Sequence, residues 1–173
     1  RNMESLQDSI HTSLALTMTA GIFMTLFGII FSPTILRWIG TPSDVMSSSV
    51  LYLRIYFGGI LSVMLYNMGS GILRAVGDSK NPLYFLIVSS ITNILLDLLF
   101  VIVFDMGIAG VGWATLIAQT ISAVLTLLLL IKTKQEYKVT LKKIRFHKDK
   151  LIEIIRLGLP SGCLLYTSPS PRD

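Results

Sequence analysis

Apolar residues in this chain form long continuous runs, and most charged residues lie between those runs. Four runs, at about 13–35, 50–73, 83–104 and 111–131, reach the length of about 20 residues that a helix needs to cross a bilayer. A fifth run, at about 157–165, is cut short. None shows the strict alternation of a membrane β-strand. We therefore predict an all-α, polytopic transmembrane helix bundle with four full spans and a truncated fifth.

The composition supports a lipid environment. Hydrophobic residues make up 52% of the chain and charged residues 14%, which is too apolar for a soluble domain of this size. The single cysteine, Cys163, cannot form an internal disulfide, and no His/Cys cluster has metal-ligand spacing. No nucleophile and base pair or nucleotide motif is present either. We predict that the protein is not an enzyme and needs no cofactor.

The basic residues predict an orientation. Nine of the fifteen lie in the segment 132–156, and Arg74 and Lys80 belong to the same side, whereas Arg37 and Arg54 belong to the other. Because loops rich in Lys and Arg face the cytoplasm, we predict that 132–156 is a cytoplasmic loop of a multi-pass cell-membrane protein that binds no nucleic acid. We interpret Arg54 as an anchor at the outer interface.

The connections and the ends of the chain carry further predictions. Pro33 predicts the end of the first span, and the short link 105–110 makes the third and fourth spans antiparallel neighbours. The chain begins with Arg1 rather than Met, so we expect an internal fragment. The polar, proline-rich residues 166–173 interrupt the fifth run, and we expect them to be a non-native tail.

Asp97 is the only acidic residue inside a predicted span. An ionised carboxylate in the membrane costs several kcal/mol without partners, so such acids are candidates for function. Asn93 lies four residues before Asp97 and Ser89 four before that, which places all three on one helix face. The alternative interpretation is a structural acid that bonds to a neighbouring helix.

The next span carries a matching polar face. Its members recur at steps of three and four and are Gly112, Thr115, Gln119, Ser122 and Thr126. Thr115 and Asp97 lie at similar depths, so the two faces can form a site for a proton or a small cation. Alternatively, these small and polar residues only hold the helices together, which we favour for Ser122 and Thr126.

The segment 52–161 resembles the multidrug and toxic compound extrusion (MATE) transporters. The matching motifs are YLRI at 52–55, LRAVGDSK at 73–80 followed by Pro82, NILLD at 93–97, IAGVGWAT at 108–115 and IRLGLP at 155–160. Each motif is weak alone, but their order and spacing are fairly specific.

The resemblance implies a twelve-helix transporter with two six-helix lobes. Residues 1–131 would then be part of the N-terminal lobe, with helices three to six, 132–156 the link between lobes, and 157–165 the start of the seventh helix. Such transporters export small cationic or amphipathic compounds by alternating access, in exchange for H⁺ or Na⁺. Asn93, Asp97 and Thr115 match the family's cation site, where Na⁺ could bind at Asp97 and Asn93; Ser89 and Gln119 would line the cavity.

Two alternatives remain open from the sequence. A lipid-linked oligosaccharide flippase of the same superfamily would need cationic residues along its cavity, and the spans offer only Arg54. A non-transporting membrane subunit would use the polar faces for packing alone. In every case membrane lipid and the rest of the transporter are the expected partners.

Overall fold

The computed structural model describes residues 3–167, and in that part of the chain it contains helices and no strand. The elements are α1 (Met3–Ile39), α2 (Met46–Gly58), α3 (Ile60–Ala75), α4 (Lys80–Leu98), the π-helical turn η1 (Leu99–Val103), α5 (Ile108–Lys132), the 3₁₀ turn η2 (Leu141–Lys143) and α6 (Lys148–Thr167). Four helical stretches are long and apolar enough to cross a membrane: Met3–Ile39, Met46–Ala75, Lys80–Val103 and Ile108–Lys132. The predicted fold class and its four spans are confirmed.

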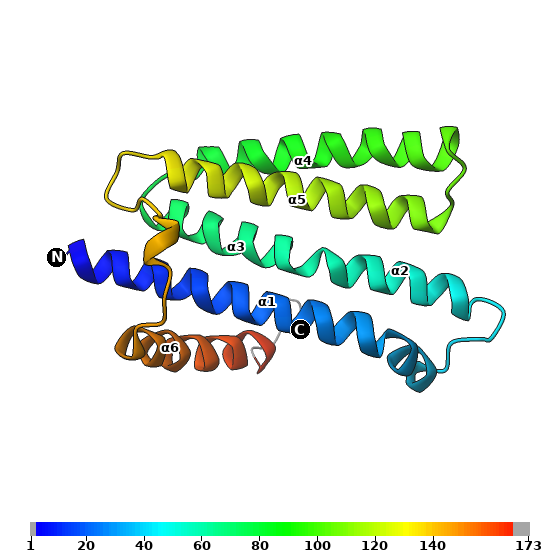
Figure 1. Ribbon diagram of the computed structural model, residues 1–173, viewed down its shortest axis with the longest axis horizontal. Coiled ribbons are helices and arrows are strands. Elements are labelled where there is room, and N and C mark those ends of the chain that lie inside the picture. Colours follow the sequence, from blue (N-terminus) through cyan, green and yellow to red (C-terminus); the bar gives the residue numbers. More distant parts are fainter. Residues whose placement is uncertain (1–2, 168–173) are drawn as a thin grey trace.

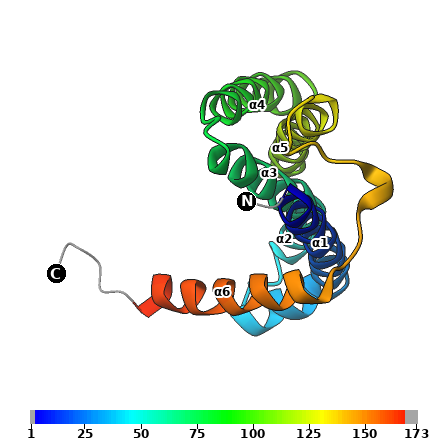
Figure 2. The same cartoon turned by 90° about the vertical axis from the view of Figure 1, so that its left-hand side faces the viewer.

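The spanning helices run side by side along the long axis (Figures 1 and 2). Helix α4 packs on α5, α5 packs on α2 and α3, and both of these pack on α1. The links from α3 to α4 and from α5 to α6 lie at one end, with the start of α1 (Figure 1). We call this the basic end, because Arg74, Lys80 and Lys132 lie there. The links from α1 to α2 and from η1 to α5 lie at the opposite end (Figure 1).

Helix α1 is longer than the predicted first span. It begins at Met3 and continues through Pro33 to Ile39, so the prediction that the helix ends near Pro33 is wrong. At about 1.5 Å per residue its 37 residues measure roughly 55 Å, well beyond the hydrocarbon core of about 30 Å. The first turns of α1 therefore project past the other helices at the basic end, where they meet the segment 133–147.

The segment 133–147, which we call the strap, crosses from the end of α5 to α6 and contains η2. The predicted loop 132–156 is too long at its C-terminal end, because α6 already begins at Lys148 instead of near 157. The N–H of Leu151 donates to the carbonyl of His147 at 2.8 Å and starts this helix. Residues 166 and 167 of the expected tail belong to α6, and the other six lie outside the described residues.

The buried core lies toward the basic end. Its members come from α1, α3, α5 and the strap and are Ile10, Leu14, Leu73, Leu130 and Val139. Helix α6 contacts α1 and then projects away from the bundle (Figure 2). Large apolar side chains are exposed along α4, such as Ile94, Leu95 and Leu98. Such a surface is suited to lipid or to further transmembrane helices.

Candidate functional site

The polar face of α4 is turned toward α5. The hydroxyl of Ser89 is buried and donates to the carbonyl of Ala118 at 2.8 Å. One turn farther along α4, the side-chain amide of Asn93 donates to the hydroxyl of Thr115 at 3.3 Å. Two members of the predicted face therefore bond directly to α5, and the structure brings Asn93 and Thr115 together.

Asp97 lies one turn beyond Asn93, and its side chain is half-buried. Its Oδ1 is buried and has no hydrogen-bond partner among the described residues. This oxygen is therefore not bonded to Asn93 or to Thr115, although Asp97 shares the face of Asn93. A buried acceptor without a partner costs about 1–3 kcal/mol, and more when it is charged. A cation at this oxygen would supply the missing partner, and a proton would remove the charge.

The helix changes its winding directly after the site. Helix α4 ends at Leu98, and η1 continues as a π-helical turn from Leu99 to Val103. Such turns are rare and occur frequently at functional sites. The sequence analysis missed this feature, since the apolar run Leu99–Val103 contains no glycine or proline that would signal it.

Gln119 lies one turn farther along α5 than Thr115, and both line a small pocket between α2 and α5. Tyr52 and Tyr56 of α2 line the same pocket, and the sequence analysis assigned neither to the site. Gly59, between α2 and α3, allows Gln119 to approach: a Cβ at Gly59 would lie 2.9 Å from Gln119 Oε1. In the sequence, Tyr52 stands out only as the first residue of the motif at 52–55, and Tyr56 lies just after that motif.

Ser122 and Thr126 of α5 bond within their own helix. Ser122 donates to the carbonyl of Gln119 and Thr126 to that of Ser122, both at 2.8 Å. The methyl group of Thr126 packs against Gly69 of α3. The contact of Thr126 with α3 fits the interpretation that this residue holds helices together, whereas the bond of Ser122 is internal to α5.

The chemistry of the site is that of oxygen and amide groups. Asn93, Asp97 and Thr115 offer an amide, a carboxylate and a hydroxyl, and hard cations prefer oxygen ligands of this kind. Among residues 3–167 no group of three His, Cys, Asp or Glu side chains could hold a metal ion. Oxygen ligands of this kind suit a proton or a small hard cation better than a transition metal.

Comparisons with known proteins agree on one family. The model of the MatE family matches residues 1–99. The chain is 35% identical over 170 residues to the probable multidrug resistance protein YoeA of Bacillus subtilis, covering 94% of this chain and 36% of YoeA. It is 37% identical over 135 residues to the probable multidrug resistance protein YpnP of the same organism, covering 78% of this chain and 30% of YpnP.

The fold agrees with the sequence match. A crystal structure of MATE in complex with MaD3S superposes with a TM-score of 0.82 at 25% identity, covering 91% of this chain and 36% of the solved one. The chain thus spans about a third of the length of these relatives. Its helices, its motifs and these matches show that the chain belongs to the MatE family, whose members are multidrug transporters of the membrane and not enzymes.

Proposed function

We propose that this chain is part of a longer secondary antiporter that exports cationic drugs in exchange for H⁺ or Na⁺, and that Asp97, Asn93 and Thr115 couple the ion to transport. One observation supports the proposal most. Asp97 holds a carboxylate oxygen buried without a hydrogen-bond partner, one turn from the bond that joins Asn93 of α4 to Thr115 of α5. The relatives YoeA and YpnP are named as probable multidrug resistance proteins, which supports a drug as the exported compound.

The mechanism follows from the cost of the unpaired oxygen. A protonated or Na⁺-bound Asp97 is tolerated between packed helices, whereas the free carboxylate favours an arrangement in which water reaches it. The ion therefore has different affinities for the two arrangements, which is the condition for coupling. The bond from Asn93 to Thr115 would transmit the change, because it links α4 to α5 beside the acid.

The proposal includes a topology. The basic end, with the strap, faces the cytoplasm, and the links 40–45 and 104–107 face outward. The protein lies in the cell membrane, and the rest of the transporter completes the cavity. Ser89 and Gln119 belong to its wall, where Gln119 already lines the pocket with Thr115.

The test is a double substitution, Asn93→Ala with Thr115→Ala, in the complete transporter. We expect drug export driven by an ion gradient to fall at least about tenfold, since a hydrogen bond beside the coupling acid is lost. Ser90→Ala with Thr92→Ala is the matched control, because these hydroxyls donate only to the carbonyls of Leu86 and Val88 within α4. Unchanged export in the first variant would instead support a non-transporting subunit.

No observation favours the oligosaccharide flippase. That function calls for cationic side chains along the cavity. In the interior of the described spans the arginine is Arg54, and its Nε–H donates to the carbonyl of Ile29 at 3.1 Å. Transport of a lipid-linked sugar by the complete protein would reverse this choice.

A further inference from the structure

The strap and the projecting start of α1 flank an open cavity of about 640 Å³ at the basic end. Its two walls differ in charge. The strap contributes Lys142, Lys143, Arg145 and His147, and α1 contributes the acidic side chains of Glu4 and Asp8 together with the polar Gln7 and His11. The basic wall is thus separate from the acidic one.

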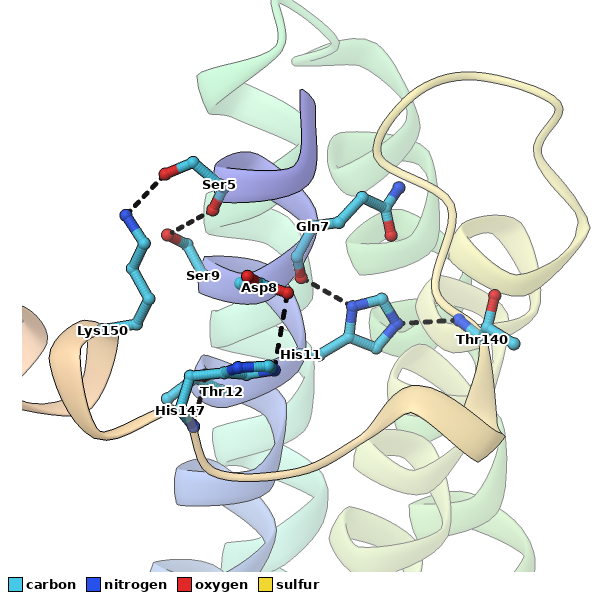
Figure 3. Close-up of polar contacts among 9 residues, drawn as sticks. All are labelled: Ser5, Gln7, Asp8, Ser9, His11, Thr12, Thr140, His147 and Lys150. Atoms are coloured by element: carbon cyan, nitrogen blue, oxygen red, sulfur yellow. Dashed lines mark hydrogen bonds and ion pairs between the residues drawn. The ribbon is translucent and has the colours of Figure 1, made fainter. Parts of the chain in front are cut away.

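The strap is held against α1 by buried side chains (Figure 3). His11, which is 2% exposed, accepts the backbone N–H of Thr140 on Nε2 at 3.0 Å, and its Nδ1 lies 2.6 Å from the carbonyl of Gln7. An amide N–H can only donate and a carbonyl can only accept, so both bonds form with a neutral imidazole that carries its proton on Nδ1. Thr12 Oγ1 accepts the N–H of His147 at 3.3 Å. The strap is therefore fixed at both ends of its basic stretch.

The three long cations of the cavity have no acidic partner among the described residues. The ion pair in the lining of this cavity joins His147 to Asp8 at 3.5 Å, and the pair of Lys150 with Glu153 lies outside it. The facing acids are already engaged, since Asp8 pairs with His147 and Glu4 has an interaction of its own. Lys142, Lys143 and Arg145 are exposed. They can therefore turn toward an external anion.

The position of the cavity indicates the source of that anion. It lies at the end where α3 and α5 finish their spans, beside the part of α1 that projects past them (Figure 1). Lipid phosphates lie at this level of a bilayer, and basic pockets between helices on the cytoplasmic side bind anionic headgroups. We propose that the cavity binds the phosphate group of an anionic phospholipid, held by Lys142, Lys143 and Arg145. This site is separate from Asp97 and does not depend on ion coupling, but it rests on the proposed cytoplasmic position of the basic end.

The experiment measures lipid retained by the complete transporter in native mass spectrometry after titration with phosphatidylglycerol, phosphatidylcholine or inorganic phosphate. The test variant combines Lys142→Gln, Lys143→Gln and Arg145→Gln. The matched control combines Lys134→Gln, Lys138→Gln and Lys148→Gln, which removes the same charge from exposed positions that do not line the cavity. Arg145→Gln alone gives a milder test if the triple variant folds poorly.

We expect the wild type to prefer phosphatidylglycerol to phosphatidylcholine. Both triple variants lose the same diffuse attraction to an anionic surface, but only the cavity variant loses direct charge-assisted bonds to the phosphate, so it should bind phosphatidylglycerol at least about tenfold more weakly than the control variant. Millimolar inorganic phosphate should not displace the lipid. Equal losses in both triple variants would show diffuse surface attraction and would overturn the proposal. Displacement by phosphate would assign the cavity to a soluble anion and would overturn the lipid assignment.

Discussion

Arg54 shows how one side chain can repair the backbone of a neighbouring helix. Pro33 has no N–H, so the carbonyl of Ile29, four residues earlier, loses its helical partner. The Nε–H of Arg54, from α2, donates to this carbonyl at 3.1 Å. The bond lets α1 continue to Ile39, and it gives Arg54 a structural role that its sequence position near the end of a span did not reveal.

The pairing of Arg54 with Pro33 can be measured by a double-mutant cycle in the complete transporter. Arg54→Leu should lower the free energy of unfolding by about 1 kcal/mol, since a carbonyl in the membrane loses its partner. In a Pro33→Ala background the loss should shrink, because the substituted alanine returns an N–H to the carbonyl of Ile29. Thermal unfolding in detergent measures both losses. Strictly additive effects would contradict the assigned role.

Asp78 stabilises the start of α4. Its carboxylate accepts the side-chain amide of Asn81 at 2.6 Å and the backbone N–H of Asn81 at 3.1 Å. These bonds, the side-chain bond most of all, hold the pKa of Asp78 below its ordinary value of about 4. A lowered pKa means that the folded state favours the charged form. The stabilisation is therefore complete above the ordinary pKa and is lost as the pH falls through the folded value.

We accordingly predict that Asp78→Asn melts at a lower temperature than the wild type at pH 7. The difference should be smaller at pH 3, because the wild-type carboxylate begins to be protonated as the pH falls below its ordinary pKa toward the lowered pKa of the folded protein. Melting curves of both proteins at the two pH values test this. A difference of equal size at pH 3 would show that charge is not the cause.

The helices differ in how far local sequence determines them. The four spans followed from apolar length, and α5 in particular ends within one residue of the predicted 131. Local sequence patterns gave wrong helix ends where a contact with a distant part of the chain determines the structure. Pro33 does not end α1, because Arg54 supplies the missing donor. Helix α6 begins within a charged stretch that has no apolar run to announce it.

The candidate site, like the helices, was predictable only in part from the local sequence. The periods of α4 and α5 predicted that their polar faces meet, but the sequence placed Thr115 at the depth of Asp97, whereas Thr115 bonds to Asn93, one turn away. The unpaired Oδ1 of Asp97, the π-helical turn after Leu98 and the pocket face of Tyr52 and Tyr56 all depend on packing between helices. No spacing in the sequence encodes them. The functional assignment of these residues stays a prediction.

Close packing of α1 on α2 gives a test of the helix arrangement. A Cβ at Gly28 would overlap the ring of Phe57, whereas a Cβ at Gly71 of α3 would meet nothing within 4 Å. Gly28→Val should destabilise the folded protein by about 1–3 kcal/mol through overpacking, and Gly71→Val should have little effect. Thermal unfolding of the two variants provides the comparison. Equal stability of both would argue against the packing of α1 on α2.

The whole bundle has one strongly basic end, which predicts its orientation in the membrane. In a Cys163→Ser background of the complete transporter, a cysteine introduced by Lys134→Cys should be labelled only from the cytoplasm. One introduced by Asp44→Cys, in the link between α1 and α2, should be labelled only from outside. Labelling of intact and opened cells with an impermeant thiol reagent distinguishes the two. The reverse pattern would invert the proposed topology.

The central claim is that Asp97 couples an ion gradient to export. The most direct measurement is transport of a lipophilic cation by the complete protein in liposomes with an imposed H⁺ or Na⁺ gradient. Asp97→Asn should abolish gradient-driven transport while leaving the protein folded and inserted, and Asp105→Asn, in the link between η1 and α5, should transport like the wild type. Gradient-driven transport at the wild-type rate by Asp97→Asn would contradict the account.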